Sequence, residues 1–249
     1  MDSLVTKILG HRLATPRDSL LFARDRDGTS SFSAASAEVQ SAFSSWKTET
    51  FARGPDDTAN HSVLLDALRA GPVAVDYQGH GAEDLWNGRV LSTSDVDALA
   101  GTGSASLFVA ATCLNAYFVD IGRETLGSAL LRVPNGGAWG VWASSALTLP
   151  TDHPLLSKTL LSAALTEGLT LGEATLKAKQ AVSDRDVRAT FHLLGDPSAR
   201  AIATRAAALT VSTPKSSASG CSMSGGPLSV LAPLVLAILA LSLRRRRSG

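Results

Sequence analysis

The chain has 249 residues, of which 45% are hydrophobic, and a formal net charge of +1. The run Arg244 to Arg247 supplies four of the 23 basic residues, so the remainder carries 19 basic against 22 acidic residues, a balance that argues against a nucleic-acid partner. Two cysteines in a chain of this length exclude a disulfide framework, and the first seven residues lack the basic and apolar regions of a signal peptide.

Between residues 18 and 205, short apolar runs alternate with amphipathic segments, which predicts an α/β domain. Four of these runs are almost continuously apolar, as expected for parallel strands that helices cover on both faces. The predicted strands are residues 19–24, 73–77, 106–111 and 138–143.

Two helices are predicted between the first and third of these strands. Asn60 is suited to cap one that ends before Gly71, because a short amide side chain accepts a hydrogen bond from a free backbone amide and glycine ends helices. By the same reasoning, Ser94 is predicted to cap a helix that ends at Gly101.

Two further helices are predicted after the fourth strand. We expect one from about residue 154 to 167 and another that runs to about Val182. The second begins at Thr170, which forms the capping-box pattern with Glu173.

A thiol and an imidazole each follow a predicted strand. Cys113 lies just after the third strand, and His80 follows the second, between Gly79 and Gly81. Carboxyl ends of parallel strands lie at one edge of a sheet, so the two side chains meet there if these strands are neighbours. A lone cysteine is more often a core residue, but the paired glycines and the nearby Trp86 favour nucleophilic catalysis, in which an imidazole activates a thiol.

Three segments resemble the gingipain-type cysteine peptidases (peptidase family C25) in order and spacing: residues 77–86 (YQGHGAEDLW), residues 111–115 (ATCLN) with Phe118, and residues 191–197 (FHLLGDP). The resemblance covers about residues 18–205 and implies a caspase-like, three-layer sandwich around a mostly parallel sheet. It also implies that His80 and Cys113 are the catalytic pair. Asp25 is implied as the acid that orients the imidazole, with Asp27 and Glu83 as alternatives.

We predict that Cys113 attacks the scissile carbonyl as a thiolate and that His80 then protonates the leaving amine. The backbone amides of Gly81 and Cys113 are candidates for the oxyanion hole. Candidates for the substrate pocket are Glu83, Trp86, Ser144 and Ser145, although packing beneath the site is the favoured role for Trp86. No cofactor is expected and no catalytic metal, because the other histidines lack metal-ligand spacing, although the sequence is compatible with structural calcium.

The carboxyl-terminal segment has a different composition. A Ser/Thr-rich linker precedes Cys221, and residues 228–243 form a nearly all-apolar stretch that four arginines follow. This predicts a short transmembrane helix with its arginines in the cytoplasm. Cysteine, apolar span and arginine cluster together resemble the bacterial MYXO-CTERM sorting tails, which implies processing near Cys221 by sorting machinery and display at the cell surface.

The predicted organisation is a remnant of a preceding segment (1–17), a catalytic subdomain (18–205), a linker (206–222) and a transmembrane sorting tail (223–249). The resemblance implies amino-terminal truncation, because the family carries a further α/β subdomain before this one. Protein or peptide is the expected substrate. A surface-anchored endopeptidase is favoured, and a transpeptidase of the sorting kind and a non-catalytic surface remnant are the alternatives.

Overall fold

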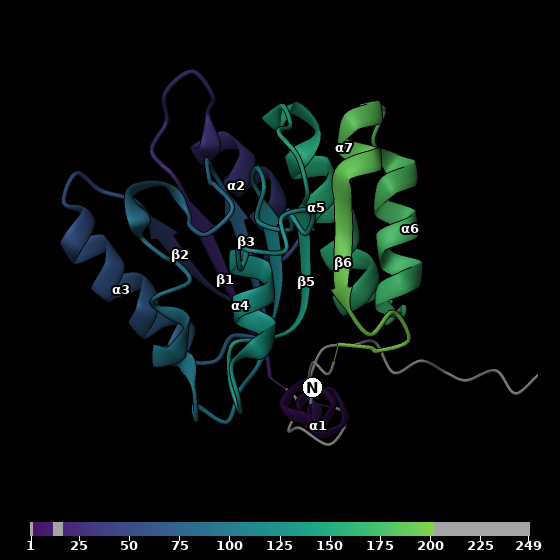
Figure 1. Ribbon diagram of the computed structural model, residues 1–249. Helices are drawn as coiled ribbons and strands as arrows, with labels where there is room; N and C mark the ends of the chain where they lie inside the picture. The colour runs from purple at the N-terminus through teal and green to yellow at the C-terminus, as the bar shows by residue number, and fades with distance from the viewer. Residues whose placement is uncertain (1, 12–16, 202–249) are drawn as a thin grey trace, which may run out of the picture. The chain divides into compact units, whose positions relative to one another are not determined.

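The computed structural model describes residues 2–11 and 17–201 (Figure 1). The strands are β1 (Ser19–Arg24), β2 (Lys47–Ala52), β3 (Ala74–Gln78), β4 (Ser106–Ala111), β5 (Ala138–Ser144) and β6 (Phe191–Gly195). The α-helices are α1 (Asp2–His11), α2 (Phe32–Ser41), α3 (Asp57–Arg69), α4 (Leu126–Arg132), α5 (His153–Leu161), α6 (Leu171–Ala181) and α7 (Arg185–Thr190). Short 3-10 turns cover Asn87–Arg89, Val96–Leu99 and Pro150–Asp152, and a π-helical turn covers Ser162–Thr166.

The six strands form one sheet in the order β2-β1-β3-β4-β5-β6. All neighbouring pairs are parallel except β5 and β6, which are antiparallel. The four predicted strands are confirmed as β1, β3, β4 and β5, with boundaries that agree within one residue.

Helices cover both faces of the sheet, which gives three layers (Figure 1). Helices α2, α5 and α6 pack over one face, where Phe22, Trp142 and Leu156 belong to a single apolar cluster. Helices α3 and α4 lie on the other face with a second cluster that includes Phe108 and Leu64. The central strands are therefore buried on both sides, as their continuous apolar runs predict.

Two predicted helix starts were wrong. Asp56, not Asn60, caps α3, accepting hydrogen bonds from the amides of Thr58 and Ala59. Asn60 lies inside the helix, and its amide exchanges two 2.9 Å hydrogen bonds with the backbone of Gly54.

The segment after Ser94 forms only a 3-10 turn, Val96–Leu99, because the Asp95 carboxylate binds the amide and hydroxyl of Ser92 and stabilises a turn there. The capping box of Thr170 and Glu173 is confirmed at the start of α6. The predicted helix at 154–167 begins one residue early, at His153, and continues from α5 into the π-helical turn.

Helix α1 packs against the domain, although the sequence indicated only a remnant there. The Lys7 ammonium donates to the carbonyls of Leu131 at 2.7 Å and Val133 at 2.6 Å, at the end of α4. The His11 ring stacks on Trp139 with centroids 4.0 Å apart. His11 is thus buried.

Within residues 2–11 and 17–201, none of the helices has the length and apolar character needed to cross a membrane. The linker, Cys221 and the apolar stretch at 228–243 lie outside the described residues.

Candidate functional site

The order of the strands places a crevice beyond the carboxyl ends of β1 and β3. From β1 the chain passes to β2 on one side of it and then to β3 on the other, so the direction of winding reverses between β1 and β3. Ligands of open α/β sheets bind at such a reversal. Asp25 follows β1 and His80 follows β3, and the backbone amide of His80 lies 3.4 Å from the Asp25 carboxylate.

Cys113 follows the strand that neighbours the one before His80. Strands β3 and β4 are parallel neighbours in which Gln78 pairs with Ala111, so His80 and Cys113 each lie two residues beyond a paired position. The amide of Gly79 continues the pairing with a hydrogen bond to the Ala111 carbonyl at 3.3 Å. Paired strands are only about 4.8 Å apart, so the two loops leave the sheet side by side.

The imidazole of His80 is exposed, while its main chain is held firmly. Its carbonyl accepts hydrogen bonds from the Tyr77 hydroxyl at 2.8 Å and from the Asn87 amide at 3.0 Å. The ring meets Phe32 edge to face at 5.0 Å, and its nitrogens form no hydrogen bond with the described residues. The ring is thus free to take part in proton transfer.

The Cys113 thiol is partly exposed and donates to the Thr148 carbonyl, with 3.6 Å between sulfur and oxygen. Thr148 belongs to the loop that follows β5, and its hydroxyl bonds to Nε2 of His153 at 3.0 Å. Leu114, directly after the cysteine, has a φ of 64°, a left-handed conformation that is costly for a leucine. Its amide bonds to the Ala146 carbonyl at 3.3 Å, which holds this backbone against the same loop.

Glycine at position 81 permits a close approach between the two loops. A Cβ atom there would lie 2.6 Å from the Thr112 hydroxyl and 3.0 Å from the Leu85 carbonyl, closer than atoms pack. The backbone next to His80 therefore lies against the side chain of Thr112, the residue before Cys113. The amides of Gly81 and Cys113 donate to no acceptor in the described part of the chain.

Trp86 and Asn115 connect the two loops beneath the surface. The indole N–H donates to the Asn115 side-chain oxygen at 2.8 Å, and the Asn115 amide donates to the Ala82 carbonyl at 2.6 Å. Trp86 also stacks on Tyr77 with centroids 4.0 Å apart. Trp86 is fully buried, so it offers no surface to a substrate and its place among the pocket candidates is wrong, while the favoured packing role agrees with its burial.

The other pocket candidates differ in exposure. Ser144 is fully buried and its hydroxyl donates to the Ala146 carbonyl, so it too was wrongly placed in a pocket. Ser145 is partly exposed and bonds to His192 at 3.1 Å. Glu83 is partly exposed and pairs with Arg123 at 3.4 Å. Of the four pocket candidates, Ser145 and Glu83 are therefore the two that a substrate could reach.

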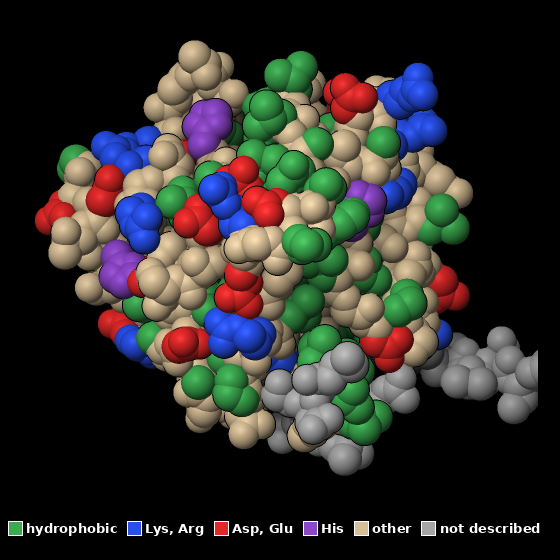
Figure 2. Space-filling view, in the orientation of Figure 1, with side chains coloured by type: hydrophobic (Ala, Val, Ile, Leu, Met, Phe, Trp, Pro, Cys, Tyr) green, Lys and Arg blue, Asp and Glu red, His purple; other side chains and the backbone are tan. Residues whose placement is uncertain are grey.

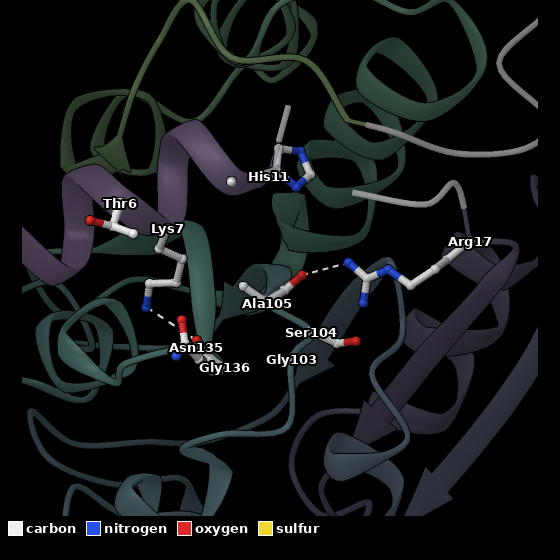
Figure 3. Close-up of a pocket in the computed structure, with 10 residues that line it drawn as sticks. Thr6, Lys7, His11, Arg17, Gly103, Ser104, Ala105, Asn135 and Gly136 are labelled. Atoms are coloured by element: carbon white, nitrogen blue, oxygen red, sulfur yellow. Dashed lines mark hydrogen bonds between the residues drawn. The ribbon is translucent and has the colours of Figure 1, made fainter. Parts of the chain in front are cut away.

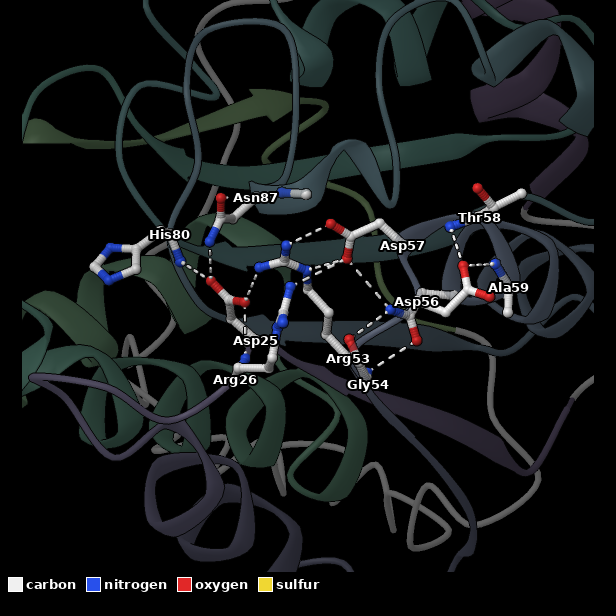
Figure 4. A network of polar contacts seen from close by, with 12 residues as sticks. Asp25, Arg26, Arg53, Gly54, Asp56, Asp57, Thr58, Ala59, His80 and Asn87 are labelled. Atoms are coloured by element: carbon white, nitrogen blue, oxygen red, sulfur yellow. Dashed lines mark hydrogen bonds and ion pairs between the residues drawn. The ribbon is translucent and has the colours of Figure 1, made fainter.

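Asp25 is the centre of a buried polar network (Figure 4). Its carboxylate pairs with Arg53 at 3.0 Å and accepts from the Asn87 side chain at 2.8 Å and the Arg26 amide at 2.7 Å. Burial disfavours its ionised form, but these hydrogen bonds and the one from His80 outweigh burial and hold the pKa of Asp25 below its ordinary value. Figure 4 shows the His80 ring pointing away from the carboxylate, so Asp25 contacts the main chain of His80 and not its imidazole.

A hollow of about 300 Å³ lies next to this edge, between the start of α2 and the start of α5. Phe32, which touches the His80 ring, lines it together with Pro150 and Pro154. The hollow therefore lies between the helix whose Phe32 contacts the His80 ring and the segment that follows the Thr148 loop.

A larger hollow, of about 420 Å³, lies at the opposite edge, near the amino ends of β4 and β5 (Figure 3). Lys7 and Arg17 line it, but both point their charge at backbone carbonyls, Arg17 at those of Gly71 and Ala105 at 2.6 Å each. Its cations are therefore used to hold the fold and are not free for an anion.

Sequence reasoning missed three residues that shape this site: Arg53, Asn115 and Thr148. Asn115 carried a signal, since it lies in the ATCLN segment two residues after the cysteine. Arg53 and Thr148 come from distant segments, and only the packing of loops shows their role. Among the described residues, no cluster of His, Cys, Asp or Glu is suited to hold a metal ion.

The bond between Trp86 and Asn115 is expected to couple the two loops energetically. Replacing Asn115→Ala leaves a buried indole N–H without an acceptor, which should lower the free energy of unfolding by about 2 kcal/mol. In a double-mutant cycle with Trp86→Phe, followed by urea unfolding, we expect a coupling energy of about 1 kcal/mol or more. Strictly additive effects would show that this bond contributes nothing to joining the loops.

Asp76 should make stability depend on pH. It is buried on β3, where Gln78 donates to both of its oxygens, and burial raises its pKa to about 7 despite hydrogen bonds from Gln78 and Ser157. Unfolding lowers this pKa, so the contribution of Asp76 to stability is greatest below about pH 4 and falls as the pH rises to 7.

The Asp76→Asn variant should therefore be more stable than the parent at pH 8, by at most about 4 kcal/mol, and the advantage should vanish near pH 4. Urea unfolding between pH 4 and 8 measures this difference, in which the contributions of the other titrating groups cancel because both variants share them. Asp66→Asn, at an exposed position on α3, is the control. A difference that stays constant over this range would contradict the assignment.

Several solved structures share this fold. Gingipain R (RgpB), described as an Arg-specific cysteine proteinase, matches 80% of the chain with a TM-score of 0.68 and 16% identity. The complex of Porphyromonas gingivalis RgpB pro- and mature domains matches 81% with a TM-score of 0.67 and 15% identity. The Saccharomyces cerevisiae separase–securin complex matches 77% with a TM-score of 0.52 and 14% identity.

At sequence identities of 14% to 16%, these matches show only that the fold is shared. The chain spans about half of each gingipain structure, 52% and 53%, and 13% of the separase structure. No curated protein matches the sequence. The sequence profile of peptidase family C25, however, matches residues 3–202, most of the chain. The α/β fold with its mostly parallel sheet agrees with this match, and the chain belongs to peptidase family C25.

Proposed function

We propose that this chain acts as a cysteine endopeptidase in which Cys113 is the nucleophile and His80 the general acid and base. The observation that carries the proposal is the pairing of β3 with β4, which puts both residues at equivalent positions on adjacent loops. Family membership supports the same chemistry. The partly exposed thiol and the exposed imidazole are both accessible to a peptide.

In the proposed reaction the thiol loses its proton to His80, and the sulfur attacks the carbonyl carbon of the scissile bond. The proton held by His80 then passes to the leaving amine, and a thioester remains on Cys113. Water, deprotonated by His80, attacks the thioester, releases the acid product and restores the thiol. The thiol must first leave its hydrogen bond with the Thr148 carbonyl.

The negative oxygen that develops during attack requires donors. The amides of Gly81 and Cys113 are proposed to supply them, since neither donates to another described group. Both belong to loops that the Trp86–Asn115 bond holds together, so these donors are fixed before a substrate binds.

Asp25 is proposed to position His80 through its backbone. The carboxylate accepts from the His80 amide and from Asn87, whose own amide donates to the His80 carbonyl. Asp25 is therefore a positioning residue in this proposal, and the imidazole needs no acidic partner.

Cell-surface display is proposed from the sequence of the tail alone. Cys221, the apolar stretch at 228–243 and the four arginines support processing and membrane anchoring, and all lie outside the described residues.

Cys113→Ala and His80→Ala test the proposed pair. Each should reduce hydrolysis of a fluorescent peptide library by at least about 100-fold, because nucleophile and proton transfer are lost. Both side chains are at least partly exposed, so the melting temperature should hardly change. His61→Ala, on α3, is the control and should keep full activity.

Hydrolysis that survives Cys113→Ala would overturn the proposal. A product joined to an added amine would identify the transpeptidase alternative. A parent thiol that reacts with iodoacetamide but turns over no peptide would identify a non-catalytic domain.

Asp25→Asn should affect stability more than chemistry. It breaks a buried pair with Arg53 and should cost about 3 kcal/mol in urea unfolding. The pH profile of the remaining peptide hydrolysis should match that of the parent, because Asp25 does not touch the imidazole. Asp27→Asn, at the alternative acid, should change neither property. A shifted pH profile in either variant would show that its carboxylate acts on the His80 ring.

A further inference from the structure

Large hydrophobic side chains are exposed in unusual number beside Cys113. Of the ten exposed large hydrophobic residues in the described part of the chain, five lie in the two loops that follow β4 and β5: Phe118, Val119, Ile121, Leu147 and Leu149. Figure 2 shows hydrophobic side chains gathered on the upper part of the face seen, above the ends of the central strands. Exposed apolar residues concentrated in this way mark a binding surface more often than scattered ones do.

Two of these residues border the thiol. Leu147 and Leu149 flank Thr148, whose carbonyl lies 3.6 Å from the Cys113 sulfur. They are 74% and 70% exposed, so neither supports the core and both have apolar area left to bury. On the adjoining loop, Phe118 is packed edge to face on His192 at 5.3 Å, and His192 bonds to Ser145 at the base of the Leu147 loop. The three side chains thus belong to connected loops around one sulfur.

The parts of these two loops nearest to Cys113 in the sequence carry no charge. Residues 112–119 and 144–151 contain no Asp, Glu, Lys or Arg. A pocket for the side chain of arginine or lysine needs a carboxylate that is not already compensated.

Two of the carboxylates nearby are compensated by cations. Glu83 pairs with Arg123, and Glu38, which lines the 300 Å³ hollow, pairs with Lys158 at 2.6 Å. Asp27, in the loop after β1, and Asp120, farther along the loop after β4, accept hydrogen bonds from the amides of Ser33 and Gly122. The surface around the thiol is therefore suited to apolar groups.

We infer that the peptide bond cleaved by this chain follows an apolar residue, whose side chain binds against Leu147, Leu149 and Phe118. This inference rests on the proposed function, because it concerns the substrate of the same cysteine. Burial of a leucine-sized side chain on this surface would favour such peptides over basic ones, and the exclusion of water would strengthen hydrogen bonds to the oxyanion.

Two peptidyl acyloxymethyl ketones that differ only in the residue before the reactive ketone, leucine or arginine, test the inference. In each, the Cys113 sulfur displaces the carboxylate group and forms a thioether, and the rate of labelling is measured by mass spectrometry on the full chain. We expect the leucine probe to label Cys113 at least about tenfold faster than the arginine probe. Cys113→Ala should abolish labelling.

Leu147→Asp and Leu149→Asp supply the residue-level test. Each should slow the leucine probe and speed the arginine probe, so that the preference falls about tenfold or more. Both positions are exposed, so the variants should fold as the parent does. Leu176→Asp, at a position on α6 that is 59% exposed, is the matched control and should leave the preference unchanged.

The outcomes separate the two proposals. A faster arginine probe, or a preference that both aspartate variants leave unchanged, overturns the apolar substrate while the peptidase stands. Labelling of Cys113 by iodoacetamide but by neither peptidyl probe overturns the proposed function itself. Self-association that Leu147→Asp abolishes, measured by sedimentation, would assign the surface to contact between copies of the chain and overturn the inference.

Discussion

The pairing of β3 with β4 in parallel register is the constraint on which the rest of this site depends. Gln78 pairs with Ala111, and both strands are buried on each face, so neither can shift by one residue without exposing its apolar side chains. The register therefore fixes where the chain leaves the sheet on each strand. This pairing determines the positions of His80 and Cys113. No direct bond between the two side chains is required to bring their loops together.

At this edge of the sheet, buried contacts hold the backbone in place, while the large apolar side chains exposed to solvent lie on the loops. On the His80 side, a buried ion pair of Asp25 with Arg53 and the stack of Trp86 on Tyr77 hold the backbone. On the Cys113 side, the backbone is held by contacts with the loop after β5, while the large side chains of that loop stay exposed. Such a division suits a site in which fixed groups carry out chemistry and exposed loops bind a partner.

The sequence predicted an element best where one local physical condition, such as burial on both faces of a strand, dictated the residue types. The four central strands must be apolar on both faces, and Thr170 with Glu173 satisfies a helix start without distant help. Strand β2 has mostly exposed residues at the sheet edge, with only Phe51 buried, so its sequence carries little strand signal. Asn60 and Ser94 failed as caps because nearby aspartates set the local structure instead: Asp56 starts α3 four residues earlier, and Asp95 binds Ser92 in a turn. The choice among such neighbours depends on the path of the whole loop.

By itself the sequence determined the α/β class, the four central strands and the placement of a histidine and a cysteine after two of them. Apolar periodicity and glycine positions are local properties, so they can be read from the order of the residues alone. Only the tertiary structure decided that β3 and β4 are neighbours, that Asp25 binds the backbone of His80 and that Trp86 is enclosed. These facts depend on which distant segments pack together, since a side chain's exposure and partners are set by the complete fold.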